Sequence, residues 1–321
     1  MDRPELPGRL ATRFDLVALS GDDVDEVFAL VTADRVAVLG TSRLPREMAR
    51  LRLTSPFPST HIGVRNDGRL VQIWDAVLYP GEPGPFAEVD THPGLLQPSD
   101  EEALEAAGWQ HLVRWTTGVV ADPVTAHLRT ARPTLDLTGR DRLSRLGFVE
   151  DRVLWVMEAA TDAERGLDRP RPSGLTIHAG ADPRAVHEIF MTGFAGTYGF
   201  VELSYDDFVA SRGRIPGYDP SLWFLATVDG RPIGAMTVTR AAPERSAMHV
   251  SELAVLPEHR GRGVATGLLH AAFEATRRDG MRLLYLFADS ESEDEAPTLY
   301  ASVGFETVQA TTQLIRPVPD P

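Results

Sequence analysis

The feature that most constrains the fold is a short glycine-containing turn between an expected strand and an expected helix. Residues 247–256 (AMHVSELAVL) have the apolar content and length of a strand, and Pro257 ends it. Residues 264–277 (VATGLLHAAFEATR) place their larger apolar side chains along one helical stripe. The segment therefore predicts a strand, a tight loop and a helix in immediate succession.

The turn itself has the composition of a phosphate-binding loop. Gly261 and Gly263 tolerate positive φ and let the backbone approach a ligand closely. The amides that they expose lie at a helix N-terminus, where unpaired donors and the helix dipole favour phosphate. Arg260 and Arg262 add fixed positive charge. A dinucleotide fingerprint fits less well, because the third glycine of that pattern is missing and the turn comes late in its unit.

The pattern Arg-x-x-Gly-x-Ala, from Arg260 to Ala265, resembles the acyl-CoA pyrophosphate loop of the GNAT N-acetyltransferase superfamily. The strand ending Leu-Ala-Val-x-Pro and the downstream Leu299-Tyr300-Ala-Ser-Val-Gly304-Phe305 are similar to two further parts of that pattern. The matches lie in the last third of the chain, and the whole chain is similar to two-domain members. The resemblance implies acetyl-CoA as the acyl donor, held by Leu253, Ala254, Val255, Arg260, Gly261, Arg262, Gly263, Val264 and Ala265.

Length and charge set broad limits on the class of protein. A chain of 321 residues is long enough for two domains of about 150 residues each. The formal net charge is −14, and each half carries −7, so no basic face for nucleic acid and no polybasic membrane patch is expected. No apolar run approaches the ~20 residues of a membrane span, and the first residues lack a signal core. We therefore expect a cytoplasmic protein of undetermined oligomeric state.

The chain contains neither cysteine nor lysine. Disulfides, thiolate nucleophiles, cysteine zinc sites, Schiff-base lysines and a Walker-type phosphate loop are all excluded at once. His187-Glu188 is followed at the required position by Met191, so no two-histidine zinc helix exists. We therefore expect chemistry without a metal, performed by His, Tyr, Ser, Asp, Glu or backbone groups.

The two halves of the chain show the same order of expected elements. Each reads as strand, two helices, three strands, helix, strand, helix and two strands, which indicates an internal structural duplication. Residues 159–174 lose all periodicity and collect Pro, Gly and charge, as a linker does. We predict a mixed α/β fold: domain 1–158, linker 159–174 and domain 175–321. In each domain the resemblance implies a mixed, mostly antiparallel sheet flanked by helices and splayed open where acyl-CoA enters.

The first half contains no counterpart of the phosphate loop. Residues 91–102 hold no arginine and place Asp100, Glu101 and Glu102 at the start of the expected helix. Carboxylates there suit the helix dipole but repel a pyrophosphate. We therefore expect residues 1–158 to be a degenerate GNAT-like domain that serves a structural role or walls the substrate cleft, leaving one active site per chain.

N-acetylation needs a neutral amine, and a general base helps to supply it. His249 is the first candidate, because the resemblance places a base on this strand and an imidazole with a pKa of ~6.5 suits the task. Glu252 is the rival: in a regular strand it faces away from His249, but the bulge that superfamily members carry in this strand could redirect it. Ser251 shares the face of His249 and could hold a water. The alternative for each is an ordinary structural side chain.

The remaining site residues follow from the resemblance. Tyr300 maps onto the tyrosine that contacts the CoA sulfur and is the expected general acid, while Glu293 replaces an asparagine that many relatives carry. A bulged strand would leave an unpaired N–H near residues 253–255 for the developing oxyanion. Aromatic residues near the first two helices of the second half could frame the acceptor or simply belong to the core: Phe194, Tyr198, Phe200 and Trp223.

The sequence thus predicts an N-acetyltransferase that moves acetyl from acetyl-CoA to a primary amine of a small molecule or peptide by direct attack in a ternary complex. Two alternatives stay open. A non-catalytic acyl-CoA-binding or sensor protein would keep the loop without turnover, and a protein N-acetyltransferase would need a wide cleft.

Overall fold

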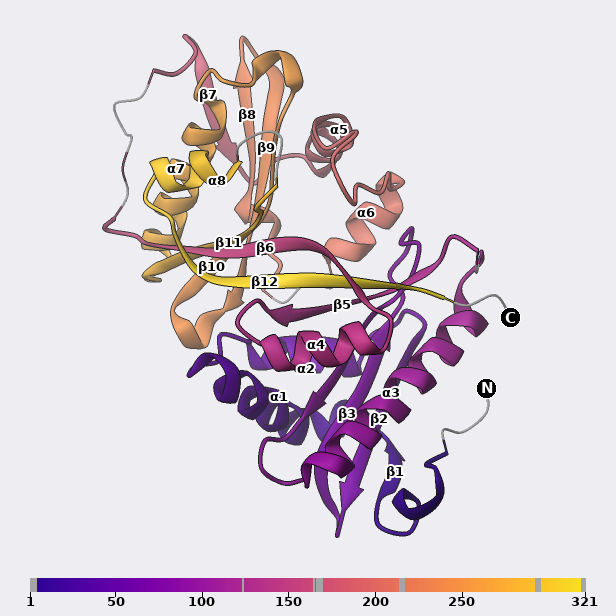
Figure 1. Ribbon diagram of the computed structural model, residues 1–321. Helices are drawn as coiled ribbons and strands as arrows, with labels where there is room; N and C mark the ends of the chain where they lie inside the picture. Colours follow the sequence, from indigo (N-terminus) through magenta and orange to yellow (C-terminus); the bar gives the residue numbers. More distant parts are fainter. Residues whose placement is uncertain are drawn as a thin grey trace. The chain divides into compact units, whose positions relative to one another are not determined.

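The computed structural model describes residues 5–122, 124–163, 165, 170–213, 217–291 and 296–318. The chain divides into two compact units (Figure 1). Unit 1 consists of Met1–Val153 with Thr311–Pro321, and unit 2 consists of Leu154–Ala310. No helix within the described ranges is both long and apolar enough to cross a membrane.

Unit 1 is a mixed sheet flanked by helices. The sheet order is β1–β2–β3–β4–β5–β12, in which only β4 and β5 run parallel among the pairs described. Its elements are β1 (Asp15–Ala18), α1 (Val24–Leu39), α2 (Arg46–Leu53), β2 (Ser59–Asn66), β3 (Arg69–Val77), β4 (Phe86–Thr91), α3 (Pro98–Val119), β5 (His127–Pro133), α4 (Leu137–Arg145), and parts of β6 (Val149–Ala160) and β12 (Glu306–Pro317).

Unit 2 repeats this order. Its sheet runs β6–β11–β10–β9–β8–β7, with β10 and β11 parallel and the other described pairs antiparallel. Its further elements are β7 (Leu175–Ala179), α5 (Pro183–Gly193), α6 (Tyr205–Arg212), β8 (Trp223–Val228), β9 (Arg231–Ala242), β10 (Ala247–Val255), α7 (Val264–Arg278), β11 (Leu283–Asp289) and α8 (Ala296–Ser302). The predicted fold class, a mixed and mostly antiparallel sheet flanked by helices in each of two tandem domains, is confirmed.

The duplication extends to the backbone of corresponding hairpins. Asp67-Gly68 joins β2 to β3 with φ of 50° and 78°, and Asp229-Gly230 joins β8 to β9 with φ of 49° and 76°. Two successive residues with positive φ give the turn whose twist suits a two-residue hairpin. Each hairpin also has one register shift, at Val64/Arg65 in unit 1 and Ala226/Thr227 in unit 2. Turn and bulge are both displaced by 162 residues (229 − 67 and 226 − 64), so the two hairpins correspond residue for residue.

The limits of the units differ from the predicted domain limits at the C-terminal strand. Residues 311–317 of β12 pair with β5 of unit 1, from Thr311 opposite Pro133 to Pro317 opposite His127. Leu314 is buried in the core of unit 1. The sequence pattern of residues 305–316 had indicated a closing hairpin or strand pair of the second half, but this segment is one continuous strand, β12. Of the predicted linker, residues 159 and 160 end β6, and 164 and 166–169 lie outside the described residues.

Helices α5 and α7 cover opposite faces of the unit 2 sheet. Ala235 of β9 packs with Val186 of α5, whereas the next residue, Met236, packs with Leu268 of α7. Successive side chains of a strand point to opposite faces, so the two clusters lie on either side of the sheet. Phe208 of α6 belongs to the α5 cluster, which places α6 on that face too.

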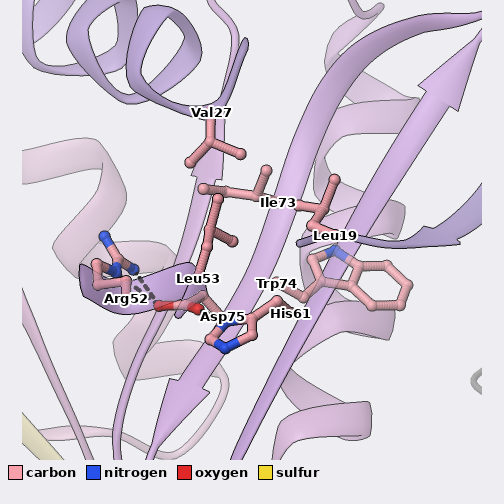
Figure 2. Close-up of a pocket in the computed structure, with 8 residues that line it drawn as sticks. All are labelled: Leu19, Val27, Arg52, Leu53, His61, Ile73, Trp74 and Asp75. Atoms are coloured by element: carbon pink, nitrogen blue, oxygen red, sulfur yellow. Dashed lines mark hydrogen bonds and ion pairs between the residues drawn. The ribbon is translucent and has the colours of Figure 1, made fainter. Parts of the chain in front are cut away.

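Unit 1 buries charged side chains on the corresponding face of its sheet. Arg52 of α2 donates from Nε to Oδ2 of Asp75 at 2.7 Å and pairs through Nη1 with Oε2 of Glu88 at 2.6 Å. His61 bonds the other oxygen of Asp75 through Nδ1 (Figure 2). The adjoining cavity has a volume of about 10 Å³, the size of a single water molecule. The face of unit 1 that these residues occupy therefore has no room for a larger ligand at this point.

A second buried group of charges gives unit 1 a pH-dependent stability. Burial, reinforced by Asp90, raises the pKa of Asp34 from 3.8 to about 6, although Arg132 lowers it. The folded chain thus holds the Asp34 proton more tightly than the unfolded chain. The resulting stabilisation is complete below pH ~4 and is lost as the pH rises through about 6, a change on the order of 3 kcal/mol at ~1.4 kcal/mol per unit.

We expect Asp34→Asn to abolish this dependence. The neutral amide resembles the protonated carboxyl, so wild type and variant should have similar free energies of unfolding near pH 4, and the variant should gain on wild type by about 3 kcal/mol at pH 7. Urea unfolding at a series of pH values measures the difference. Asp122→Asn is the control, because hydrogen bonds from Thr125 and Val124 lower the pKa of the exposed Asp122. The difference in free energy of unfolding between wild type and Asp122→Asn should therefore not change with pH above pH ~4.5. A flat difference for Asp34→Asn would contradict the assignment.

Candidate active site

The unit 2 sheet opens between two of its central strands. β10 and β11 pair in parallel only from Ala247 opposite Leu283 to His249 opposite Tyr285. Beyond that row β10 stays paired with β9 as far as Val255, and β11 stays paired with β6 as far as residue 289. The strands therefore separate after His249, and backbone groups of residues 250–255 lie along the opening. An extended ligand could add to this strand edge as another strand would.

A β-bulge in β10 changes which side chains face the opening. The register between β9 and β10 shifts at Ser251. His249 lies opposite Thr239, and Glu252 lies opposite Thr237. Because 237 and 239 are two residues apart they share a face, and directly opposed residues share it as well. The bulge therefore brings Glu252 to the face of His249, which simple alternation would not.

His249 lies in an aromatic surrounding at the point where the strands separate. Its ring stacks on Tyr285 at 4.7 Å between centroids and meets Phe287 edge-on at 5.4 Å. Nδ1 lies 3.2 Å from Oγ of Ser251, which lies 3.4 Å from Oγ1 of Thr239. Desolvation by burial lowers the pKa of His249 from 6.5 to about 4. The imidazole is therefore neutral near pH 7 and able to accept a proton, although as a weak base.

Glu252 is engaged by an arginine from α6. Arg212 donates from Nε to Oε2 of Glu252 at 3.2 Å, and its Nη2 pairs with Oε1. Thr237 donates from Oγ1 to Oε2 at 3.3 Å. The guanidinium of Arg212 also lies over the ring of Phe208, 4.4 Å from its centroid. Both oxygens of the Glu252 carboxylate thus already accept hydrogen bonds.

Tyr300 lies on α8, the short helix that follows β11 in the chain. Its ring meets Phe305 edge-on at 6.0 Å, and both pack with the main core cluster of unit 2. Burial raises the pKa of Tyr300 from 10.0 to about 12. The phenol therefore keeps its proton at every working pH and can donate a hydrogen bond. The predicted departure at Glu293 lies outside the described residues.

The glycine turn has the backbone that the sequence predicted. Gly261 and Gly263 have φ of 70° and 81°, and Gly263 is the N-cap of α7. A Cβ on Gly263 would lie 2.3 Å from the carbonyl oxygen of Pro170, so the position admits no side chain without a shift of backbone. The first turn of α7 contains no acidic residue. Its first amides are thus free of a competing carboxylate on the helix itself.

The two arginines of the turn serve different purposes. Arg260 donates from Nε to the carbonyl oxygen of Val255 at 3.2 Å and from Nη2 to that of Gly193 at 2.7 Å. It therefore fastens the turn to the ends of β10 and α5. Arg262 is exposed and can present its charge to a ligand.

The other residues predicted to bind the cofactor have side chains that pack in the core of unit 2. Val264 is buried in the core, and Leu253 and Ala265 pack against the same cluster. Ala254 packs in the α5 cluster. What these residues could offer acyl-CoA is their amides and carbonyls, at the strand edge and at the start of α7.

The aromatic residues predicted for the acceptor separate into core and surface. Trp223 is 1% exposed and packs edge-on against Phe208 at 5.6 Å, so in this conformation its indole has no surface for a ligand. Burial in the α5 cluster explains this position. Phe194 packs tilted against the α5 core, Phe200 is half-buried, and Tyr198 is 54% exposed. Of the four aromatic residues, only Tyr198 exposes more than half of its surface to solvent.

The structure adds Arg212 and Phe287, which the sequence analysis did not name. Phe287 is 56% exposed on β11 next to His249, on the face that α5 and α6 cover. Its neighbours in sequence form an apolar strand, so the pattern gave no sign that this ring would stay uncovered. Arg212 is the last residue of α6, a position at which basic residues are common in helices, and its partner lies 40 residues away in the chain.

The corresponding region of unit 1 is built differently. The β3/β4 ladder runs without a register shift from Gln72 opposite Thr91 to Val77 opposite Phe86. The carboxylates at the start of α3 are paired with arginines within unit 1, as in Asp100 with Arg13 at 2.8 Å. Among the residues that the structure describes, no group of three or more His, Asp or Glu is placed to hold a metal ion.

Comparisons with known proteins agree with this geometry. Residues 219–307 match the family model described as an acetyltransferase (GNAT) domain. A mycothiol acetyltransferase of Frankia casuarinae is 29% identical over 177 residues, covering 51% of this chain and 51% of the relative. An uncharacterised N-acetyltransferase of Methanocaldococcus jannaschii is 28% identical over 104 residues, covering 31% of this chain and 46% of the relative. The chain thus spans about half the length of the curated relatives that it matches.

Solved structures share the fold over almost the whole chain. A GCN5-related N-acetyltransferase from Sphaerobacter thermophilus superposes with a TM-score of 0.78 at 20% identity, covering 98% of both chains. A tandem GNAT protein from the clavulanic acid biosynthesis pathway gives 0.73 at 17% identity, covering 96% of this chain and 99% of the other. The chain therefore has the fold of these N-acetyltransferase structures, one of which is a tandem GNAT protein, and its residues 219–307 resemble a GNAT acetyltransferase domain.

Proposed function

We propose that unit 2 is an acyl-CoA-dependent N-acyltransferase that moves acetyl from acetyl-CoA to a primary amine of a small molecule or peptide. The observation that carries the proposal is the bulged, splayed β10 leading through a glycine turn into α7. The match to the GNAT domain model and the names of the two relatives support acetyl transfer as the reaction.

The residues of unit 2 fit acetyl-CoA as donor. The amides at the start of α7 and the exposed Arg262 suit its pyrophosphate. Backbone groups of residues 250–255 suit the pantetheine arm, and an amide beside the bulge could stabilise the oxyanion. The acidic first turn of α3 argues that unit 1 does not bind CoA in this way, so one site per chain is expected.

The side chains near the opening can manage the protons of a direct attack. His249, neutral near pH 7, accepts the amine proton as the nitrogen–carbon bond forms. Tyr300, protonated throughout, donates to the sulfur as the carbon–sulfur bond breaks. No acyl-enzyme step is needed, which agrees with a chain that contains no cysteine. Phe287 and Tyr198 offer exposed aromatic surface to the acceptor.

Calorimetric titration of the full chain with acetyl-CoA tests the proposal. We expect one site per chain, because the glycine turn occurs once. Two sites would overturn the assignment of unit 1, and no binding would overturn the function. Release of free CoA in the presence of a panel of primary amines then measures turnover.

A non-catalytic acyl-CoA sensor is the alternative, and one observation favours it. The two candidate bases are a histidine whose pKa burial lowers to about 4 and a carboxylate already paired with Arg212. Saturable binding with no release of CoA for any amine would select the sensor.

A further inference from the structure

The two units carry the same row of cross-strand neighbours at equivalent positions. In unit 2 the row crosses β8, β9 and β10, and in unit 1 it crosses β2, β3 and β4. On the first two strands of each row, the positions differ by 162, as the hairpins do. The rows are Trp223, Thr237 and Glu252 in unit 2, and His61, Asp75 and Glu88 in unit 1.

Each row ends on a glutamate that pairs with an arginine, and the two arginines come from equivalent helices of the two units. In unit 2 the partner of Glu252 is Arg212, the last residue of α6. In unit 1 Glu88 pairs with Arg52, in the last turn of α2, at 2.6 Å, and through its other oxygen with Arg35 of α1 at 2.7 Å. The Arg212–Glu252 and Arg52–Glu88 pairs each join the second helix of their unit to its fourth strand. The correspondence cannot be recognised from the sequence alone, because a shift of 162 positions, which superposes the hairpins, does not superpose Arg52 on Arg212.

The features suited to acyl-CoA chemistry are present in unit 2 alone among these matched positions. The counterpart of His249 is Phe86, since the residues opposite them, Thr239 and Val77, are also 162 apart. The β3/β4 ladder lacks the bulge of β10. The residues between β4 and α3 contain no arginine. An arginine–glutamate pair that occurs in both settings does not depend on the bulge, the histidine or the phosphate loop.

We infer that Arg212 is a positioning residue and that Glu252 serves as its partner rather than as the general base. The pair holds α6 against β10 next to the bulge and so fixes the strand on which His249 lies. The inference rests on the proposed function and narrows it. Of the two candidate general bases, His249 and Glu252, it leaves only His249.

The contacts of the pair explain why it acts as a unit. The two side chains are only 17% and 20% exposed, so removal of one charge leaves the other poorly solvated. Nη1 of Arg212 bonds Oγ of Ser211 at 2.9 Å, and the guanidinium lies over Phe208, so its orientation is fixed independently of any ligand. A carboxylate held by two donors of one guanidinium is poorly placed to take a proton from an amine.

A double-mutant cycle with Arg212→Gln, Glu252→Gln and the double variant tests the inference. We expect each single variant to show a roughly 10-fold lower kcat with little change in the KM for acetyl-CoA, and the double variant to be no worse than the singles. The acid limb of the pH profile should stay in place. Arg212→Lys should restore activity to within about 3-fold of wild type, because a charged partner is kept. In unit 1, Glu88→Gln is the matched control and should lower the unfolding midpoint without affecting kcat.

Two outcomes would overturn the inference. One is a roughly 100-fold or greater decrease in the turnover rate of Glu252→Gln, with the acid limb abolished and Arg212→Gln near wild type, as expected for a general base. The other is additive loss in the double variant.

Unfolding midpoints separate this inference from the proposed function. The same cycle measured by thermal unfolding needs no turnover. Non-additive midpoints in a chain that acetylates no amine would support the pairing and overturn the function. Additive midpoints would overturn the pairing whatever the activity.

Discussion

Replacement of Gly263 by aspartate is expected to weaken acetyl-CoA binding by at least ~100-fold. Gly263 has φ of 81° and a hypothetical Cβ only 2.3 Å from the carbonyl oxygen of Pro170, so any side chain displaces the turn. The new carboxylate would also lie at the N-terminus of α7, where it takes the place that favours a phosphate and repels a pyrophosphate. Calorimetric titration with acetyl-CoA measures the loss directly.

Gly94 offers a matched control in unit 1. It lies between β4 and α3, the position that the phosphate turn occupies in unit 2, with φ of 76° and open space around a hypothetical Cβ. Gly94→Asp should leave acetyl-CoA binding unchanged. Gly263→Ala separates strain from charge: a smaller loss than that of aspartate is expected. Full-strength binding by Gly263→Asp, with a normal unfolding midpoint, would show that the turn does not hold the cofactor.

The strand, turn and helix around Gly263 were predictable because their determinants are local. The expected strand 247–256 and helix 264–277 agree closely with β10 and α7. Apolar periodicity fixes such elements, and a glycine at a helix start fixes the turn. The hairpin at Asp229-Gly230 has an equally local determinant, since that dipeptide favours two successive positive φ angles.

Other features depend on pairing between distant segments, which periodicity does not encode. Glu252 faces the side of His249 because the ladder with β9 skips Ser251, whereas alternation alone puts it on the other face. Residues 311–317 pair with β5, a strand about 180 residues earlier in the chain. Neither arrangement leaves a mark in the local sequence.

Side-chain exposure was the least predictable property of the site. Trp223 and Phe287 are both aromatic residues on strands of unit 2, yet the first is 1% exposed and the second 56%. The difference arises because α5 and α6 cover β8, while β11 parts from β10 beside Phe287. A pattern of apolar residues predicts that a strand is buried, but not where a neighbouring strand leaves it.

Replacement of His249 by alanine is expected to slow turnover on the order of 100-fold, the lower end of what general-base catalysis contributes. Burial lowers the pKa of His249 to about 4, so the neutral form that accepts a proton is present above that pH and lost below it. With a strongly electron-poor aromatic amine as acceptor, whose nitrogen stays unprotonated even at pH ~4, wild-type kcat should therefore be level from about pH 5 to 8 and fall as the pH drops through about 4. In the variant the residual rate should lack this fall.

An exposed histidine of the same unit provides the comparison. His178 lies on the edge strand β7, where its Nε2 contacts Oγ1 of Thr176 at 3.1 Å, and His178→Ala should keep both kcat and the pH profile of wild type. An unchanged unfolding midpoint in His249→Ala would show that the loss of turnover does not come from destabilisation of the fold. If the turnover rate of His249→Ala stays within about 3-fold of wild type and retains the fall near pH 4, a group other than His249 accepts the amine proton. The hydroxyl of Ser251, 3.2 Å from His249, would then be the next group to test as the site of a bound water.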